Sequence, residues 1–364
     1  MSAILTRGRV SKTLHAELFS EPGVPALEEI HGASGASGEW SRKYHYRRWP
    51  SQQAREAHKL PLDLRPQALP PMALQPWRLR AGRLKPHGDV VSARVPLLYG
   101  PATLACVARF EKSCPADRFF RNGDGHELWF VQEGRGLLAS EYGVLPFRPG
   151  HYVLIPKGTT YRVELESEDC FLLMIESRFP IRVAPEHLNA SGQAALWAPF
   201  VETEIEAPEF RPPRDEEGVC RVWTKHDGGF VTEAFLGHHP FDLVGWEGAL
   251  YPYAAAAERR AFHAGRSRGE GLTIRSFHDA DAPAAYAHSN PDCDEAFFFT
   301  KAALMTFHPG ALPHAPQGTA ARRSHAEHGQ LAEHLTVSLE AVFEPLRAAK
   351  QALAVAEKDK PSGE

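Results

Sequence analysis

The sequence is poor in several features that point to particular classes of protein. Its five cysteines are scattered and form no CxxC pair, so neither a disulfide-stabilised domain nor a zinc module is expected. No apolar run approaches the length that spans a bilayer, and the opening residues lack the apolar core of a secretory signal. We therefore expect a cytoplasmic protein with reduced thiols and no membrane partner.

A surplus of positive charge is also absent. Lys and Arg number 41 against 45 Asp and Glu, which gives a formal net charge of −4. Nucleic acids and anionic membranes attract proteins mainly through Lys and Arg contacts to phosphates. Nucleic acid is therefore not an expected partner either.

Glycine, proline and histidine are plentiful instead. The 29 glycines and 30 prolines are typical of many short strands joined by tight turns. Eleven of the 19 histidines fall between His226 and His334. Because imidazole is a common metal ligand and a near-neutral base, this part of the chain is predicted to carry the chemistry. The alternative is chance clustering on a wet surface.

Hydrophobic patterning predicts an all-β fold class. From about residue 88, short segments alternate apolar with polar residues, which indicates antiparallel barrels or sandwiches. The earlier residues are polar, glycine-punctuated and proline-rich, which favours an irregular arm. An alanine-rich segment after Pro345 predicts a short helix. The predicted units are an N-terminal arm and linker over 1–87, a first barrel over 88–185, a linker over 186–218, a second barrel with a metal site over 219–345, and a C-terminal helical tail over 346–364.

The first predicted barrel carries a spacing of Pro156, Gly158 and Tyr161 that resembles the cupin pattern P-x-G-x-x-H. A metal-binding cupin has histidine where this chain has Tyr161. A neutral phenol is a weak ligand, and its ionisation is costly inside an apolar barrel. The first barrel is therefore predicted to be structural, with His126 and His151 at the surface or supporting neighbouring side chains rather than binding metal.

The second predicted barrel carries two clusters of potential metal ligands. One contains His288 and Glu295, and the other contains His308 and His314. Two imidazoles and one carboxylate form the facial triad of non-haem iron(II) oxygenases. The turn signal Ser-Asn-Pro-Asp between His288 and Glu295 lets the two side chains converge from the limbs of a bend. Periodicity alone does not decide whether Glu295 or Asp294 is the carboxylate ligand. The alternative to a metal site is that these histidines are ordinary turn residues.

Three further segments make the resemblance more specific. The stretch HHPFDLVGWEGALYPY (residues 238–253) resembles the P-F-D-V-V-G-W-x-G-x-x-x-P-Y signature of the homogentisate 1,2-dioxygenase family. Residues 288–295 and 308–314 resemble the family's H-S-N-x-x-x-D-E and L-H-P-G-G-I-P-H-G segments. Weaker similarity covers GASGASGEWSRKYHY near the start of the chain and ELWFVQEGRGLLASEYG in the first barrel.

The resemblance implies a bicupin fold of two jelly-roll barrels, the first without metal, and a homo-oligomer. It implies iron(II) as cofactor, held by His288, Glu295 and His314. It implies His263 as the catalytic base, and His308 beside the metal facing the substrate. Tyr253 is expected to line the substrate pocket or to pack the barrel. The implied reaction opens homogentisate with dioxygen to give maleylacetoacetate.

Departures from the family pattern leave the substrate open. The chain has no tyrosine between Glu295 and His314, where the family carries one that reaches the substrate carboxylate, and Gly-Ala-Leu replaces Gly-Gly-Ile at residues 310–312. The expected partners are therefore dioxygen and a small aromatic acid, either homogentisate or a related hydroquinone or catechol acid. The alternatives are a metal-dependent cupin isomerase and a non-catalytic bicupin that binds a small aromatic acid.

Overall fold

The structure is a computed structural model of the chain, and it describes residues 4–13, 18–35, 37–47, 58–59, 64–66, 76–200, 202–267, 270–278, 291–310, 335–341 and 344–345. Within these residues the regular structure is β-strand apart from three short 3-10 helices, η1 (Ala81–Arg83), η2 (Pro185–His187) and η3 (Glu202–Glu204). The predicted all-β fold class is therefore confirmed. The predicted C-terminal helix over 346–364 lies outside the described residues.

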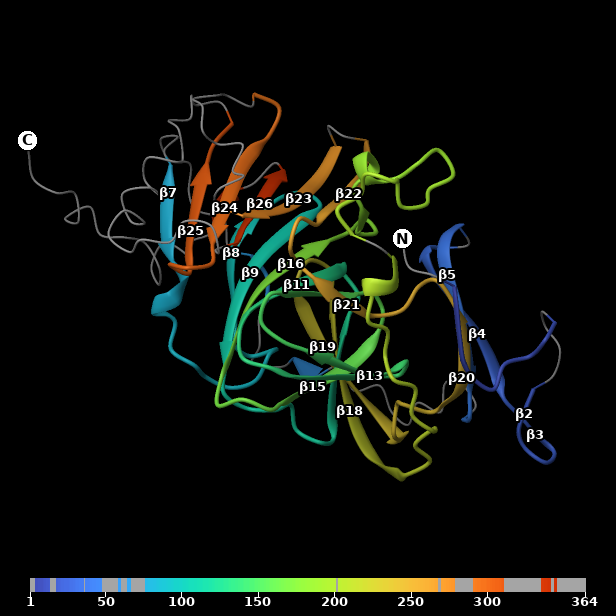
Figure 1. Ribbon diagram of the computed structural model, residues 1–364. Coiled ribbons are helices and arrows are strands. Elements are labelled where there is room, and N and C mark those ends of the chain that lie inside the picture. Colours follow the sequence, from blue (N-terminus) through green and yellow to red (C-terminus); the bar gives the residue numbers. More distant parts are fainter. Residues whose placement is uncertain are drawn as a thin grey trace, which may run out of the picture.

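Three seven-stranded sheets form the main body of the molecule (Figure 1). The middle sheet has the order β21 (Tyr253–Ala256), β14 (His151–Ile155), β11 (His126–Glu133), β16 (Cys170–Ser177), β9 (Thr103–Phe110), β8 (Arg94–Tyr99) and β27 (Glu344–Pro345). The barrel sheet has the order β13 (Gly143–Phe147), β12 (Gly136–Ser140), β15 (Thr160–Leu165), β10 (Arg118–Asn122), β18 (Glu217–His226), β19 (Phe230–His238) and β6 (His58–Lys59). The outer sheet has the order β17 (Arg182–Val183), β22 (Ala261–Ser267), β23 (Glu270–His278), β26 (Leu335–Ala341), β24 (Asp294–Phe299), β25 (Leu304–His308) and β7 (Trp77–Arg80).

The middle sheet is apolar on both faces, because its central strands are apolar at nearly every position. Along β11, Trp129 and Val131 are buried in the core shared with the barrel sheet. The alternate residues, Leu128 and Phe130, are buried in the core shared with the outer sheet. Successive side chains of a strand point to opposite faces, so one strand can supply both cores. The three main sheets are therefore stacked in the order barrel, middle, outer.

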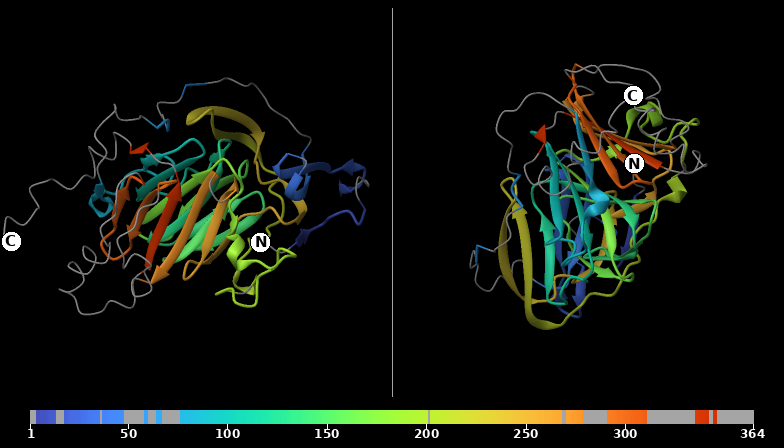
Figure 2. Two further views of the ribbon diagram at one scale, coloured as in Figure 1. Left: turned by 90° about the horizontal axis from the view of Figure 1, so that it is seen from above. Right: turned by 90° about the vertical axis from the view of Figure 1, so that its left-hand side faces the viewer.

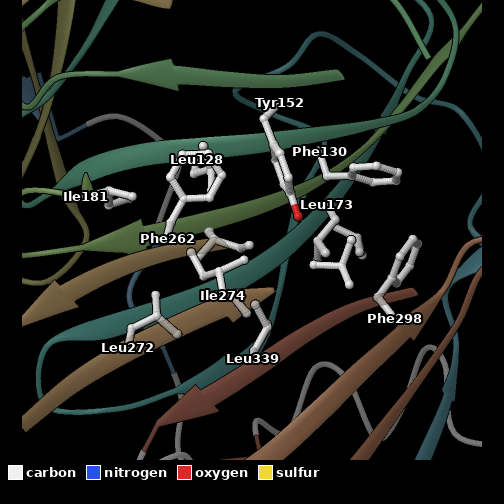
Figure 3. Packing of buried hydrophobic residues seen from close by; sticks show 14 of the residues in the cluster. Leu128, Phe130, Tyr152, Leu173, Ile181, Phe262, Leu272, Ile274, Phe298 and Leu339 are labelled. Atoms are coloured by element: carbon white, nitrogen blue, oxygen red, sulfur yellow. The ribbon is translucent and has the colours of Figure 1, made fainter. Parts of the chain in front are cut away.

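Figure 3 shows the core between the middle and outer sheets. The ring of Phe298 in β24 meets the rings of Phe130 and Phe171 edge to face, with centroids 6.4 and 6.2 Å apart. Leu173 and Leu339 face each other across the same layer (Figure 3). Edge-to-face pairs add about 0.5–1.5 kcal/mol beyond burial of their area, so this core fixes the outer sheet firmly on the middle sheet.

The N-terminal segment is not the irregular arm that the sequence predicted. It forms a four-stranded arm sheet in the order β1 (Leu5–Gly8), β20 (Leu243–Gly248), β5 (Ser37–His45) and β4 (Leu27–Ser34). A two-stranded ribbon, β2 (Phe19–Glu21) with β3 (Val24–Pro25), accompanies it (Figure 2). Polar side chains of β5 are buried between charged partners, so the segment lacks the apolar alternation from which strands are predicted.

Strands from the range predicted for the second barrel are shared among all of these sheets. β18 pairs in parallel with β10 of the first barrel, with Arg221 opposite Arg118. β20 lies in the arm sheet, β21 lies in the middle sheet, and β22 to β26 lie in the outer sheet. The polypeptide therefore crosses repeatedly between layers after residue 217.

The pairing of β5 with β20 is reinforced by buried charges. His45 lies between two carboxylates: its Nδ1 is 2.8 Å from Asp242 Oδ1 and its Nε2 is 2.8 Å from Glu29 Oε2. Arg42 of β5 pairs with Glu247 of β20. Burial alone would lower the pKa of His45, but the hydrogen bonds to Asp242 and Glu29 outweigh it and raise the pKa to about 9. The imidazolium thus ties the arm sheet to the loop before β20.

All five cysteines lie in described segments, and none of them forms a disulfide bond. Among the residues that the structure describes, no helix has the length and apolar character needed to cross a membrane.

We expect the His45→Gln variant to lose part of the stability of the wild-type protein at neutral pH. Because the folded pKa of His45 is raised to about 9, its contribution is complete below the unfolded pKa near 6.5 and disappears as the pH rises through 9. The loss should be on the order of 2–3 kcal/mol below pH 6 and close to zero above pH 10. Urea unfolding at a series of pH values measures it, and a loss independent of pH would contradict the assignment of charge to His45.

Candidate active site

One transverse row of directly opposed residues crosses six strands of the outer sheet. The row follows from the pairing register of adjacent strands. Directly opposed residues of antiparallel strands lie on the same face of the sheet, with Cβ atoms about 4.5–5.5 Å apart. From one edge to the other, the members of this polar row are Arg182, His263, Thr273, Glu340, Glu295 and His308.

The polar row lies on the face of the outer sheet that points away from the middle sheet. The residues next to its members along each strand, such as Phe262, Ala296 and Phe307, are buried in the core against the middle sheet. Since side chains alternate along a strand, His263, Glu295 and His308 must project from the other face. The row is therefore a band of polar chemistry on a sheet whose opposite face is apolar.

Glu295 and His308 form the end of this row. Glu295 is only 6% exposed, and His308 lies directly opposite it on β25. The His308 ring also meets the ring of Phe297 edge to face, with centroids 6.4 Å apart. A buried carboxylate needs compensating charge or hydrogen bonds. A divalent metal ion would supply such charge, and a carboxylate beside an imidazole suits iron(II) as a donor set.

The structure distinguishes the two neighbouring carboxylates that the sequence left open. Asp294 points to the opposite side of β24 from Glu295, because the two residues are adjacent in a strand. Its Oδ1 accepts a hydrogen bond of 2.8 Å from the backbone N–H of Gly310. Asp294 therefore holds the end of the β24–β25 hairpin, while Glu295 faces the row with His263 and His308.

His263 lies in the same row, on β22. Its Nδ1 is 3.4 Å from Thr273 Oγ1 on the adjoining strand, and Arg182 of β17 is directly opposite on its other side. Thr273 and Arg182 were not singled out in the sequence. Their positions depend on cross-strand register, which the periodicity of a single strand does not reveal.

Two of the three predicted metal ligands, His288 and His314, lie outside the described residues. Within the described segments, no group of three His, Cys, Asp or Glu side chains is arranged to hold a metal ion. The residues that flank the two missing positions are described: β24 begins at Asp294, and β25 ends at His308. In the sequence, His288 precedes Asp294 by six residues and His314 follows His308 by six.

Tyr253, predicted to bind substrate, lies elsewhere. It is in β21, which pairs with β14 of the middle sheet, and it is 6% exposed. It lines a small cavity together with Tyr251 and His126. The structure thus does not place Tyr253 in the polar row.

The family-like signature at residues 238–253 mainly holds the arm sheet in place. Asp242 binds His45, and Glu247 binds Arg42. Trp246 is fully buried, and its indole N–H donates a hydrogen bond of 3.0 Å to the carbonyl oxygen of Tyr142. The polar and aromatic side chains of this segment therefore form a buried interface between the arm sheet and the first barrel.

The interior of the first barrel contains an ionic cluster at the position where a metal-binding cupin has its histidine. Tyr161 is fully buried, and its hydroxyl donates to Glu127 Oε2 at 2.6 Å. The Arg94 guanidinium donates to Glu127 Oε1 at 2.6 Å and to Tyr161 Oη at 2.8 Å. Asn122 donates to the same carboxylate at 3.0 Å. The Arg94 guanidinium thus provides the positive charge beside Glu127 and Tyr161.

The protonation states of this cluster follow from its charges. Burial raises the pKa of Glu127, but the Arg94 charge and the hydrogen bond from Tyr161 outweigh burial and lower the pKa below its ordinary value. Burial and the neighbouring Glu127 charge raise the pKa of Tyr161 well above its ordinary value. Glu127 is therefore ionised and Tyr161 is neutral at physiological pH, in agreement with a structural role for this barrel.

The two histidines of the first barrel differ from each other. His126 is not a surface residue: it is 2% exposed, because it begins β11 at the junction of the middle sheet and the arm sheet. His151 is half-buried at the start of β14, and its Nδ1 is 3.9 Å from Glu206 Oε1.

Comparison with known proteins gives two kinds of similarity. Residues 102–256 match the family model described as homogentisate 1,2-dioxygenase, N-terminal. A protein of Saccharolobus solfataricus, provisionally described as a dioxygenase, is 24% identical over 370 residues, which cover 92% of each chain.

Solved structures resemble the chain only distantly. Protein Ylba from E. coli is 9% identical, with 78% of this chain and 96% of that chain covered at a TM-score of 0.34. A cupin 2 conserved barrel domain protein from Leptotrichia buccalis is 12% identical, with 73% and 95% covered at a TM-score of 0.33.

Replacing Arg94 by Met should destabilise the protein by about 3–5 kcal/mol, because the Glu127 carboxylate would be left buried without its cation. Chemical denaturation measures the loss. The double variant Arg94→Met/Glu127→Leu removes both charges and should recover most of it. Equal stabilities of the single variant and the wild type would show that Arg94 does not neutralise Glu127.

Proposed function

We propose that the protein is a non-haem iron(II) dioxygenase that opens the ring of homogentisate or a related dihydroxyphenyl acid. The observation that carries the proposal is the polar row, which brings Glu295, His308 and His263 to one face of the outer sheet. The similarity to a homogentisate 1,2-dioxygenase family model and to a dioxygenase-like relative supports the same chemistry.

The proposed iron ligands are His288, Glu295 and His314. Glu295 provides the anionic ligand from a buried position on β24. His288 precedes β24 and His314 follows β25, so the three donors come from both sides of one hairpin. Iron held by these three residues would supply open coordination positions for the substrate and would lower the pKa of a bound phenol.

The chain's own residues have three proposed tasks around the substrate. His263 accepts the phenolic proton, which suits an imidazole near neutral pH. Thr273 Oγ1, 3.4 Å from Nδ1, keeps the His263 ring oriented. His308 contacts the substrate from the strand opposite Glu295, and Phe297 beside it excludes water. Tyr253 lines a separate small cavity beside the middle sheet and has no task in this scheme.

The proposed reaction balances without a further reductant. Both oxygen atoms enter the product, the dioxygen bond and one ring carbon–carbon bond break, and two carbon–oxygen double bonds form at the cleaved carbons. With homogentisate the product is maleylacetoacetate.

The deciding experiment is anaerobic loading with iron(II), followed by oxygen-electrode measurements over a panel of dihydroxyphenyl acids. Oxygen uptake in a one-to-one ratio with ring cleavage is the expected result. Turnover without oxygen would instead support a metal-dependent isomerase. A protein that binds an aromatic acid but no metal after reconstitution would be a non-catalytic bicupin.

Glu295 and Asp294 provide a matched pair of variants. Glu295→Gln should lose bound iron and lower activity by roughly 100-fold or more, because supporting residues of metal sites alone cost 10–100-fold. Asp294→Asn should retain both iron and activity, because Asp294 binds the backbone of Gly310. Iron content by elemental analysis and oxygen uptake measure the two effects. If only the Asp294→Asn variant lost iron, Asp294 rather than Glu295 would be the metal ligand.

His263→Gln should lower kcat by roughly 10²–10⁴-fold, the usual contribution of a general base, while the iron content stays at the wild-type level. The measurement is kcat with homogentisate alongside iron content. Thr273→Val should lower kcat by a smaller factor, because the ring loses its hydrogen-bond partner. Thr273→Ser keeps the hydroxyl and should keep kcat near the wild-type value. An iron-depleted His263→Gln protein would show instead that His263 holds the metal.

A further inference from the structure

A second candidate binding site lies at one end of the first barrel, away from the polar row. It is a pocket of about 390 Å³ between connections of the middle sheet and of the barrel sheet. The β8–β9 turn, the connection from β10 to β11, the ends of β14 and β16, and the β18–β19 turn all contribute to its lining. Small-molecule sites typically have volumes of roughly 300–1,000 Å³, so the pocket is large enough for a small organic ligand.

The polar part of the lining contains an ionic cluster whose carboxylates are already occupied. Lys225 has a side chain that is only 3% exposed, and its Nζ is 2.6 Å from Glu176 Oε1 and 3.1 Å from Asp124 Oδ2. Asn122 Nδ2 donates to Glu176 Oε2 at 2.8 Å, and the backbone N–H of Gly228 donates to Asp124 Oδ1 at 3.0 Å. Each oxygen of both carboxylates therefore already has a cationic or N–H partner.

Two further basic residues of the lining have no anionic partner. Lys157 follows β14 and Arg178 follows β16, and these strands are the two neighbours of β11. Within the described segments, Lys157 Nζ donates only to the backbone carbonyl of Asp124, at 3.3 Å, and the Arg178 guanidinium has no hydrogen bond or ion pair. Both side chains are exposed, so a ligand can reach their charged ends.

The net effect of these charges is an excess of unpaired positive groups. The third acidic residue of the lining, Asp227, has its Oδ2 2.8 Å from His226 Nδ1, so it does not neutralise Arg178 or Lys157. An anionic ligand would give Arg178 and Lys157 the partner that the described part of the chain does not supply. A carboxylate suits Arg178 in particular, because a guanidinium can bind it through two parallel hydrogen bonds.

The rest of the lining is largely apolar and favours an organic acid over an inorganic anion. Pro66, Tyr99, Pro101 and Leu104 line the pocket, and Tyr99 is 37% exposed. Ligand sites typically combine an apolar lining, which buries the body of the ligand, with a few polar groups that orient it. Inorganic phosphate has no apolar part to bury there.

We infer that this pocket binds a small organic acid, with its carboxylate on the Arg178 guanidinium beside Lys157 and its apolar body against Tyr99 and Leu104. No member of the polar row lines the pocket. The inference therefore does not depend on the proposed iron site, and either can fail without the other.

4-Bromobenzoate is the probe for this site, because its bromine scatters anomalously and marks the position of the ring. Crystals of the full chain soaked in 4-bromobenzoate should show a bromine peak in the pocket, and the Arg178→Met variant should lose it. Arg135→Met is the matched control and should keep the peak, because Arg135 is also exposed but lies in the β11–β12 turn at the other end of β11. The neutral 4-bromobenzamide should give no peak there.

Three results would overturn the inference: no bromine peak in the pocket of the wild type, an equal peak with the neutral amide, or an equal peak in Arg178→Met. Because the Arg178 guanidinium has no partner within the described segments, its replacement should leave the unfolding temperature unchanged. Loss of the peak can then be assigned to loss of the guanidinium.

A titration in solution tests the inference independently of crystals. Addition of 4-bromobenzoate should shift the Nε–H resonance of Arg178 until the site is saturated. Lys157→Met should raise the dissociation constant roughly 3-fold, the effect of one exposed ion pair, and Arg135→Met should leave it unchanged. An Arg178 resonance that does not move in the wild type would contradict the site.

Discussion

Both faces of the middle sheet must be covered, and this requirement places every other layer of the molecule. Strands β11 and β16 are apolar at successive positions, so each buries one set of side chains against the barrel sheet and the other against the outer sheet. The outer sheet can cover the middle sheet only with its own apolar face. Its polar residues are thereby directed to the opposite side, where Glu295, His308 and His263 fall into one row. The candidate active site is thus a consequence of how the core is closed.

Buried charges perform a different task in the rest of the molecule. In the first barrel, Arg94 neutralises Glu127 beside Tyr161, in the place where a metal-binding cupin has a ligand. In the arm sheet, His45 does the same between Asp242 and Glu29. In both clusters the buried charges are paired, and removing one partner would leave the other charge buried without compensation. The signature around Asp242 is therefore best understood as a junction that fixes the arm against the first barrel.

The sequence predicted the β-rich fold class because strands with a buried face leave a clear alternation. It also predicted a structural first barrel from Tyr161, and the structure places the Arg94–Glu127 pair beside that residue. The strands of the arm were missed because their buried side chains are polar and satisfied by partners far away in sequence. Periodicity could not separate Glu295 from Asp294, since β24 is apolar on both faces. Only the register with β25, and the contact of Asp294 with Gly310, distinguishes them.

The register between strands also determines which residues share the polar row, and the pattern of a single strand does not reveal this. Arg182, Thr273 and Glu340 are ordinary residues in three separate segments, and only the pairing of β17, β22, β23 and β26 aligns them with His263 and Glu295. Tyr253 illustrates the opposite case: its motif is close in sequence to His263, but β21 pairs with the middle sheet and carries the phenol to another cavity.

The most direct test of the account is an anomalous difference map at the iron absorption edge, from crystals loaded with iron(II) without oxygen. The account predicts one strong peak within coordination distance of the Glu295 carboxylate, about 2.2 Å, on the face of the outer sheet that carries His263. A peak at the Glu127 cluster of the first barrel, or no peak in iron-loaded crystals, would contradict it.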